Sequence, residues 1–318
     1  PLTRKRMETA DEEFVAAARK FVDRQVKADK PFFVWLNTTG MHFRTHRAEK
    51  HVGKSGQGFY NDVMVAHDEL VGEMLNQLDE LGIADNTVVM YSTDNGVEKV
   101  GWPDGGTAPF RGEKNDNWEG GFHVPLVVRW PGVIEPGRRS SATISHLDWF
   151  PTIMAALGDT DIKERMLKET PFGKGNTKVH LDGYNFLPYF KGDAKEGPRK
   201  EFFYFSDVGE LMNLRYGRFK IVFAEQRAHG FAVWENPLTP LRFPKLFDLY
   251  QDPFEIGDHE AIGYSKWRAE RMFALAPAQA YVANFLKTFE AYPPRQKPAS
   301  FSIDQVLETL QTGGTGSN

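Results

Sequence analysis

Short apolar runs alternate with amphipathic stretches over the first half of this sequence, and this order is the strongest constraint on its fold. Residues 9–28 and 60–81 carry apolar side chains at helical spacing. Residues 31–36, 87–92 and 124–130 are short apolar runs, typical of buried strands. A succession of strand, helix and strand predicts an α/β sheet that contains parallel strand pairs.

The pattern changes after about residue 160. Before that point, residues 145–158 predict one more helix, which Gly158 ends. From residue 201 onward, several aromatic-rich runs follow one another without a helix between the first of them: EFFYFSD, LMNLRYGRFKIVFAE, FAVWEN and KLFDLYQDP. Such runs favour an antiparallel sheet.

The chain is predicted to end in helices at about 265–290 and 302–311. We therefore expect an α/β core domain over residues 1–200 and a smaller domain over residues 201–318. The smaller domain should contain the antiparallel sheet and these helices, which makes it α+β.

Composition removes several classes of function. The formal net charge of −4 leaves no broad basic face for a nucleic acid. No apolar run approaches the roughly 20 residues that a membrane-spanning helix needs. The chain contains no cysteine, which excludes disulfides, zinc thiolates and a cysteine nucleophile but leaves the cellular compartment open.

Polar side chains follow the predicted strands 31–36 and 87–92, and more of them occupy the loop before the predicted strand 124–130. In an open α/β sheet, ligands bind outside the carboxyl ends of the strands. Oxygen donors of the Asp and Asn type suit Ca²⁺ or Mg²⁺ better than zinc, and a cation beside lysine and histidine makes a site for an oxyanion. The side chains in question are Asn37, His42, His46, Asp94, Asn95, Arg111, Lys114 and Glu119.

Each of these elements also has a purely structural interpretation. The sequence Asp94-Asn95-Gly96 is a common turn, because Asn and Gly tolerate positive φ. A single histidine near a strand end is more often a core or surface residue than a catalyst. Most lysines in a charged loop such as that of Lys114 are simply solvated. From the residues alone, a metal and oxyanion site is therefore one hypothesis among these alternatives.

The motifs of the chain, taken in order, resemble those of the type I sulfatases, and among them the bacterial arylsulfatases. The resemblance covers nearly the whole chain. Its segments are PFFVWLNTTGMHFRTH, YNDVMVAHDELVGEMLNQLDELGIADNTVVMYSTDNG, PFRGEKNDNWEGGFHVPLVVRWPGVI, SHLDWFPTIMAALG, HLDGYNFLPYFKG, EFFYFSD, LRYGRFKIVF and LFDLYQDPFE.

This resemblance implies a fold similar to alkaline phosphatase: a mainly parallel sheet flanked by helices, with its N-terminal strands missing from this chain, and a smaller C-terminal domain. It implies hydrolysis of small-molecule sulfate esters at a divalent cation, usually Ca²⁺. It also implies a periplasmic or secreted location.

The same resemblance assigns roles to individual positions. Asp94 and Asn95 match two of the metal ligands. Lys114 resembles the lysine that contacts the sulfate and the leaving-group oxygen. His42 resembles the histidine that contacts the sulfate and protonates the leaving group. His46 belongs to the same MH…TH pattern and is expected to help bind the substrate.

The chain departs from the family pattern at one decisive place. Sulfatases of this type use a formylglycine made from Cys or Ser in a C/S-x-P-x-R motif, and neither form of the motif occurs here. The family's Asp-Asp pair of metal ligands, and a further Lys and His, would also precede the matching segment. We therefore expect a C-terminal part of an arylsulfatase that is inactive alone, binds metal weakly and self-associates through an exposed sheet edge.

Two other functions stay open. A phosphonate or phosphodiester hydrolase of the same superfamily shares the metal and oxyanion design, although the MH…TH and RGEK segments favour sulfate. A non-catalytic binding protein on the same scaffold is the third alternative. Trp102 and Trp118 are candidates for lining an aryl or sugar pocket, with ordinary packing as the alternative for both.

Overall fold

The computed structural model describes residues 1–106 and 108–293, so the predicted helix at 302–311 lies outside the described residues. Contacts between Cα atoms divide the chain into two units. The first unit comprises Pro1–Lys114, Gly120–Arg139 and Ala228–Glu235, and the second comprises Asn115–Glu119, Ser140–Arg227 and Asn236 onward. The domain boundary expected at residue 200 stays a prediction. The contacts themselves group residues 140–200 with the later part of the chain.

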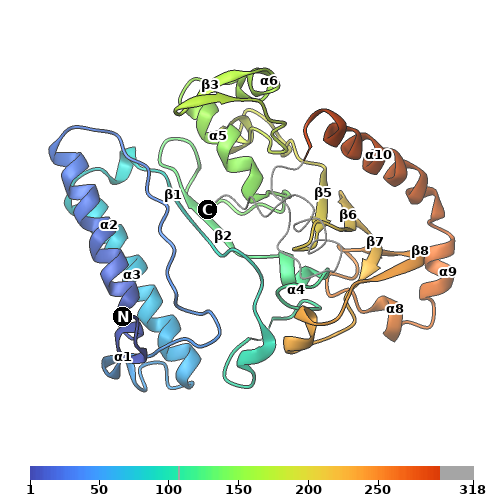
Figure 1. The fold of residues 1–318 in the computed structure, drawn as a ribbon, viewed down its shortest axis with the longest axis horizontal. Helices are drawn as coiled ribbons and strands as arrows, with labels where there is room; N and C mark the ends of the chain where they lie inside the picture. The colour runs from blue at the N-terminus through green and yellow to red at the C-terminus, as the bar shows by residue number, and fades with distance from the viewer. Residues whose placement is uncertain (107, 294–318) are drawn as a thin grey trace, which may run out of the picture. The chain divides into compact units, whose positions relative to one another are not determined.

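Two long helices form the helical part of the first unit, as the periodicity predicts. Helix α2 (Ala10–Lys27) and helix α3 (Phe59–Glu80) lie side by side (Figure 1). Val15 and Val22 on α2 are buried, as are three apolar residues of α3. Buried Gln77 ties the pair together, because its side-chain amide donates to the backbone oxygen of Arg19 (2.9 Å) and to Asp23 (2.8 Å). Helix α1 (Arg4–Met7) precedes α2.

The strands of the first unit are β1 (Val89–Ser92) and β2 (Leu126–Arg129), and they pair antiparallel, with Val89 opposite Arg129. The expectation of a parallel pair is wrong for these two strands. A parallel pair needs a crossover, usually a helix. Among the described residues between β1 and β2, only η3 (Lys99–Gly101) and α4 (Glu119–Phe122) are helical, and the chain returns in the opposite direction.

The predicted strand at residues 31–36 is not a strand within the part of the chain that the structure describes. Its side chains alternate between more and less exposed, as in a strand, but Phe33 is 72% exposed and Trp35 is 81% exposed. Nothing in the described residues therefore covers this apolar face. Self-association through such a surface stays a prediction.

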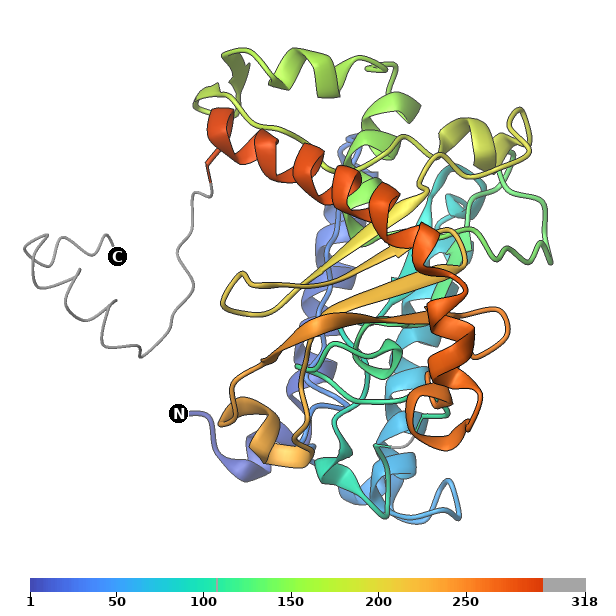
Figure 2. The same ribbon diagram turned by 90° about the vertical axis from the view of Figure 1, so that its right-hand side faces the viewer.

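The second unit contains the predicted antiparallel sheet. Its strands are β5 (Glu201–Phe205), β6 (Leu211–Tyr216), β7 (Phe219–Glu225) and β8 (Thr239–Asp248), paired in that order. Helix α10 (Leu275–Ala291) runs across one face of this sheet (Figure 2). The contact is apolar: Leu214, Ile221, Leu246 and Ala278 form a buried cluster.

One aromatic-rich run that the sequence suggests as a strand is helical instead. The first four residues of FAVWEN, 231–234, lie in the 3₁₀ helix η5 (Gly230–Trp234), which belongs to the first unit. The remaining elements are short: η1 (Glu49–His51), η2 (Ala84–Asn86), η4 (His146–Asp148), α5 (Trp149–Ala156), α6 (Ile162–Met166), β3 (Thr170–Phe172), β4 (Gly175–Thr177), α7 (Leu187–Lys191), α8 (Gly257–Glu260), α9 (Tyr264–Ala269) and η6 (Met272–Ala274). Among the described residues, none of the helices has the length and apolar character needed to cross a membrane.

Candidate functional site

Asp94 and Asn95 follow β1 directly and are held by short-range hydrogen bonds. The Asp94 side chain is exposed, and its carboxylate accepts a hydrogen bond of 3.3 Å from the Thr93 hydroxyl. The side-chain amide nitrogen of Asn95 donates to the backbone oxygen of Gly96 (2.9 Å). The strand therefore ends by presenting one carboxylate and one amide oxygen at the start of the long loop.

Gly96 is required here by close packing between backbones. Its amide donates to the backbone oxygen of Gly121 (2.9 Å). A Cβ atom at position 96 would lie 1.7 Å from the backbone oxygen of Gly120, and a Cβ at position 120 would lie 2.4 Å from that of Arg111. Helix α4 and the loop segments around Gly96 and Arg111 thus meet through their backbones. The segment after β1 is therefore packed against distant parts of the chain and does not form a turn by itself.

We expect Gly96→Ala to destabilise the protein by about 1–3 kcal/mol or more, because the added methyl group overlaps a backbone oxygen that cannot rotate away. Urea unfolding of the two proteins measures the difference. Gly72→Ala is the matched control: position 72 lies inside α3 with open space around it, so alanine should stabilise by up to about 1 kcal/mol. Equal stability of the Gly96 variant and the parent would contradict the packing argument.

Lys114 lies beside the segment that follows Asn95. Its backbone amide donates to the oxygen of Val97 (3.1 Å). Its ammonium lies 3.3 Å from a carboxylate oxygen of Glu98 and 5.8 Å from the centre of the Trp234 ring. The side chain is 19% exposed, so the interpretation of Lys114 as a freely solvated lysine is wrong. In this structure its charge is paired with Glu98.

The short helix η5 connects the regions around two predicted site residues, and sequence reasoning did not assign it to the site. Trp234 contacts the ammonium of Lys114. Phe231 makes an edge-to-face contact with Phe43, the neighbour of His42, at 5.4 Å between ring centres. The spacing of Phe231 and Trp234 could have indicated this helix. Residues three apart lie on the same face of a helix, whereas in a strand they lie on opposite faces.

His42 is exposed, and the hydrogen bond of its ring defines its tautomer. Nδ1 lies 3.0 Å from the backbone oxygen of Phe43, and a carbonyl oxygen can only accept. Nδ1 therefore carries the proton in the neutral ring, which leaves Nε2 as the nitrogen that can exchange a proton. The loop bends tightly here, with Met41 at φ 73° and Arg44 at φ 63°.

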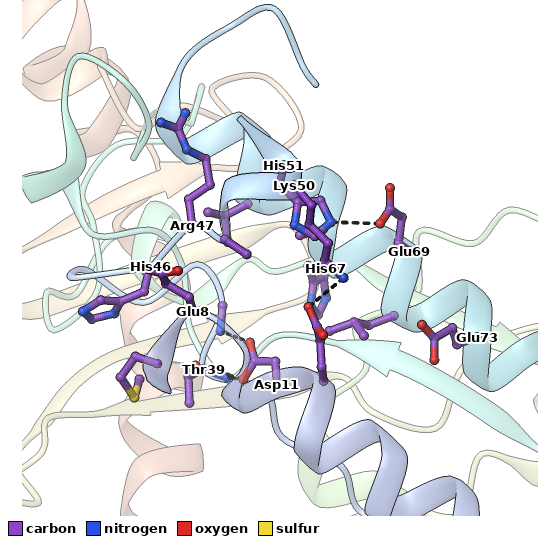
Figure 3. A pocket seen from close by; sticks show the side chains of 17 residues that line it. Glu8, Asp11, Thr39, His46, Arg47, Lys50, His51, His67, Glu69 and Glu73 are labelled. Atoms are coloured by element: carbon purple, nitrogen blue, oxygen red, sulfur yellow. Dashed lines mark hydrogen bonds and ion pairs between the residues drawn. The ribbon is translucent and has the colours of Figure 1, made fainter. Parts of the chain in front are cut away.

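His46 occupies a different environment from His42. It lines a small cavity of about 50 Å³, together with His51 and His67. In Figure 3 the ring of His46 points away from these two histidines, and its Nδ1 atom is buried without a hydrogen-bond partner. Burial lowers the pKa of His67, which therefore favours its neutral form. His67 therefore adds little positive charge to the cavity wall.

Carboxylates on α2 and α3 fix the loop that carries His42 and His46. Asp11 accepts hydrogen bonds from the backbone amides of Thr39 and Gly40, both at 2.7 Å (Figure 3). Further along, buried Asp62 accepts from Arg47 (2.6 Å) and from the Ser55 hydroxyl (2.6 Å). Hydrogen bonds from Ser55 hold the pKa of Asp62 well below its usual range. The two helices thereby position both ends of this loop.

The described residues do not complete a calcium site. Asp94 and Asn95 offer hard oxygen atoms, but Ca²⁺ takes six to eight such ligands. Over residues 1–106 and 108–293, no group of three or more His, Asp or Glu side chains is arranged to hold a metal ion. Two adjacent donors are at most part of a ligand set.

Comparisons with known proteins agree with the resemblance found in the motifs. The family model described as "Sulfatase" matches residues 1–159. "Arylsulfatase A" of Bos taurus is 30% identical over 254 residues, which is 76% of this chain and 47% of the relative. "Steryl-sulfatase" of Mus musculus is 31% identical over 248 residues, 71% of this chain and 37% of the relative. The chain therefore spans less than half the length of these curated relatives.

A solved structure supports the fold. The PsFucS1 sulfatase from Pseudoalteromonas sp. superimposes with a TM-score of 0.77 at 24% sequence identity, over 93% of this chain and 56% of that one. The mixture of helices and strands, with an antiparallel sheet in the second unit, is consistent with this likeness. The predicted α/β, alkaline-phosphatase-like fold class is thereby confirmed.

Proposed function

This chain belongs to the sulfatase family, and from that premise we propose that it is part of a sulfuric ester hydrolase that acts on aryl or related sulfate esters. The observation that carries the proposal is the position of Lys114. Its backbone is bonded to Val97, two residues after Asn95, so a cationic side chain lies beside the polar end of β1.

We propose that Lys114 and His42 act on the reacting group. A sulfuryl group in transfer spreads negative charge over its oxygen atoms, and a lysine ammonium in a partly enclosed site stabilises that charge. Substrate oxygens would replace Glu98 as the partner of Lys114. His42, when doubly protonated, would donate its Nε2 proton to the leaving oxygen while Nδ1–H stays bonded to Phe43. His46 would help bind the substrate.

We further propose that Asp94 and Asn95 are two ligands of a Ca²⁺ or Mg²⁺ ion, which would supply additional positive charge for the sulfate oxygens. The nucleophile would be a formylglycine, and no residue of this chain provides it. The other metal ligands and the nucleophile would then come from outside this chain. Resemblance to the bacterial arylsulfatases also supports a periplasmic or secreted location.

Calorimetric titration of this 318-residue chain with Ca²⁺ should reveal only weak binding, with a Kd no tighter than about 1 mM, because two oxygen donors cannot replace the water shell of the ion. Asp94→Ala should remove what binding there is, and Asp85→Ala, a change elsewhere in the same unit, should leave it unchanged. Micromolar binding by the parent chain would contradict the two-ligand assignment.

Hydrolysis assays test the proposed function. The complete protein, including the formylglycine segment, should hydrolyse 4-nitrophenyl sulfate, and this chain alone should not. An aryl phosphonate and an aryl phosphodiester serve as parallel substrates. Faster turnover of either would favour the phosphonate or phosphodiester hydrolase. No turnover of any substrate by the complete protein would favour a binding protein. Steady turnover by this chain alone would show that the missing nucleophile is not needed.

A further inference from the structure

A cleft of about 440 Å³ lies in the first unit. Its wall includes Lys99, Trp102, Glu113, His229 and Gly230. Its volume falls within the range of about 300–1,000 Å³ that is typical of sites for small organic ligands. The cleft is therefore large enough for a single six-membered ring with its substituents.

Glu113 holds two walls of this cleft together. The carboxylate is buried, with 1% of the residue exposed. One oxygen accepts a hydrogen bond from the backbone amide of Lys99 (3.0 Å), and the other accepts from that of Gly230 (2.9 Å). The two amides come from segments far apart in the sequence, so this single carboxylate fixes their separation. Hydrogen bonds of the fold therefore hold the cleft in its shape.

The side chains at the opening differ in character from Glu113. The Trp102 ring is 71% exposed. The Lys99 ammonium forms no ion pair with any residue that the structure describes. His229 is exposed beside them. A ligand entering the cleft therefore meets a flat aromatic face next to an unneutralised cation, while the carboxylate of Glu113 is occupied by backbone amides. A ring that carries an anionic group matches this arrangement.

Two residues of the cleft wall are sequence neighbours of the ion pair at the proposed position of the sulfate. Glu113 immediately precedes Lys114, and Lys99 immediately follows Glu98, the ion-pair partner of Lys114. A molecule whose ester group reached Lys114 would therefore extend its ring toward Lys99 and Trp102.

We propose that this cleft binds the ring of the sulfate ester and selects rings that carry a carboxylate, with Trp102 against the ring face and Lys99 against the carboxylate. The placement beside Lys114 rests on the proposed function. The selection itself is a property of the cleft alone, and it would make the natural substrate a doubly anionic molecule, with the carboxylate on the same ring as the ester or on the ring next to it.

Equilibrium binding to the 318-residue chain tests this proposal without any sulfate ester. Ligand-observed NMR titrations compare methyl β-glucuronide with neutral methyl β-glucoside, and benzoate with neutral benzyl alcohol. In at least one pair the carboxylate should bind about fivefold more tightly than its neutral counterpart. The pair that shows the difference identifies the ring as a sugar or an aryl group.

Two variants assign the effect to the cleft. Lys99→Ala should abolish the preference for the carboxylate, and Lys20→Ala, at an exposed position on α2, should preserve it. Trp102→Ala should weaken both members of the pair about fivefold, whereas Trp35→Ala, also at a highly exposed tryptophan, should not. Equal binding of charged and neutral probes, no saturable binding, or a preference that survives Lys99→Ala would overturn the proposal. Because no probe is a sulfate ester, these outcomes are independent of whether the complete protein hydrolyses sulfate.

Discussion

Replacing Lys114 by alanine in the complete protein is expected to lower kcat/KM for 4-nitrophenyl sulfate by about 10²–10³-fold. A loss of this size is typical when one preorganised hydrogen-bond donor is removed from a site where negative charge develops in the transition state. The structure gives a reason for a large value: the Lys114 side chain is mostly covered, and its backbone is fixed to Val97. In the variant, water would therefore stabilise the negative charge of the reacting group less well than the ammonium does.

A matched lysine separates this effect from a general loss of positive charge. Lys54 belongs to the same unit, pairs with Glu69 at 2.7 Å, and is 41% exposed, so Lys54→Ala should change kcat/KM by less than about twofold. Lys114→Arg keeps the charge but alters its geometry and should give an intermediate value. If Lys114→Ala retained more than a tenth of the parent activity, the assigned role of Lys114 would be wrong.

Lys220→Ala is expected to destabilise the second unit by about 3–5 kcal/mol. The Lys220 side chain is fully buried on β7. Its ammonium lies 2.7 Å from Glu255 and 3.1 Å from Glu119, two carboxylates that are themselves buried. Removing the ammonium leaves these two buried negative charges close together, with Arg215, 3.6 Å from Glu119, as the remaining cation beside them.

The protonation behaviour of the two carboxylates agrees with this dependence. Burial raises the pKa of Glu255. Burial alone would also raise the pKa of Glu119, but the Lys220 charge and the hydrogen bond from the Tyr204 hydroxyl (2.7 Å) hold that pKa below its usual value. Loss of the lysine would therefore force one carboxyl group to take up a proton or the cluster to open.

Urea unfolding of the chain measures the effect, with each transition fitted separately because the two contact units need not unfold together. Lys200→Ala is the control: this lysine is 49% exposed and pairs with Glu196, which is exposed, so about 1 kcal/mol or less is expected. Adding Glu255→Gln to Lys220→Ala should recover part of the loss, because one buried charge disappears. A change below 1 kcal/mol for Lys220→Ala would show that water reaches the cluster.

The sequence predicts which segments form helices and strands better than it predicts which strands pair with each other. The helical periodicity at 9–28 and 60–81 corresponds to α2 and α3, because one apolar face of each helix is buried. Strand pairing depends on contacts between distant residues, which periodicity does not contain. The antiparallel register of β1 with β2 and the unpaired, exposed segment 31–36 were for that reason not predicted.

In the candidate site too, the sequence indicates individual residues but not the contacts between them. Asp94 and Asn95 can be selected from their place directly after an apolar run, since ligand groups follow strand ends. Lys114 comes from the polar loop before the run 124–130, and its role is assigned by the resemblance to the sulfatases. The ion pair between Lys114 and Glu98 depends on how the loop folds back, and no local pattern specifies it. Trp118, a candidate for a pocket wall, is instead 3% exposed and packs against Phe247 in the second unit, so packing is its correct interpretation.

Neither contact unit is a continuous piece of chain, and this has a consequence for synthesis on the ribosome. Residues 1–139 contain most of the first unit, but η5, which touches both Lys114 and Phe43, is translated only after residue 227. The emerging N-terminal half must therefore wait for roughly ninety further codons before its last segment is made. During that interval the Phe43 ring lacks the contact with Phe231 that it makes in the folded chain.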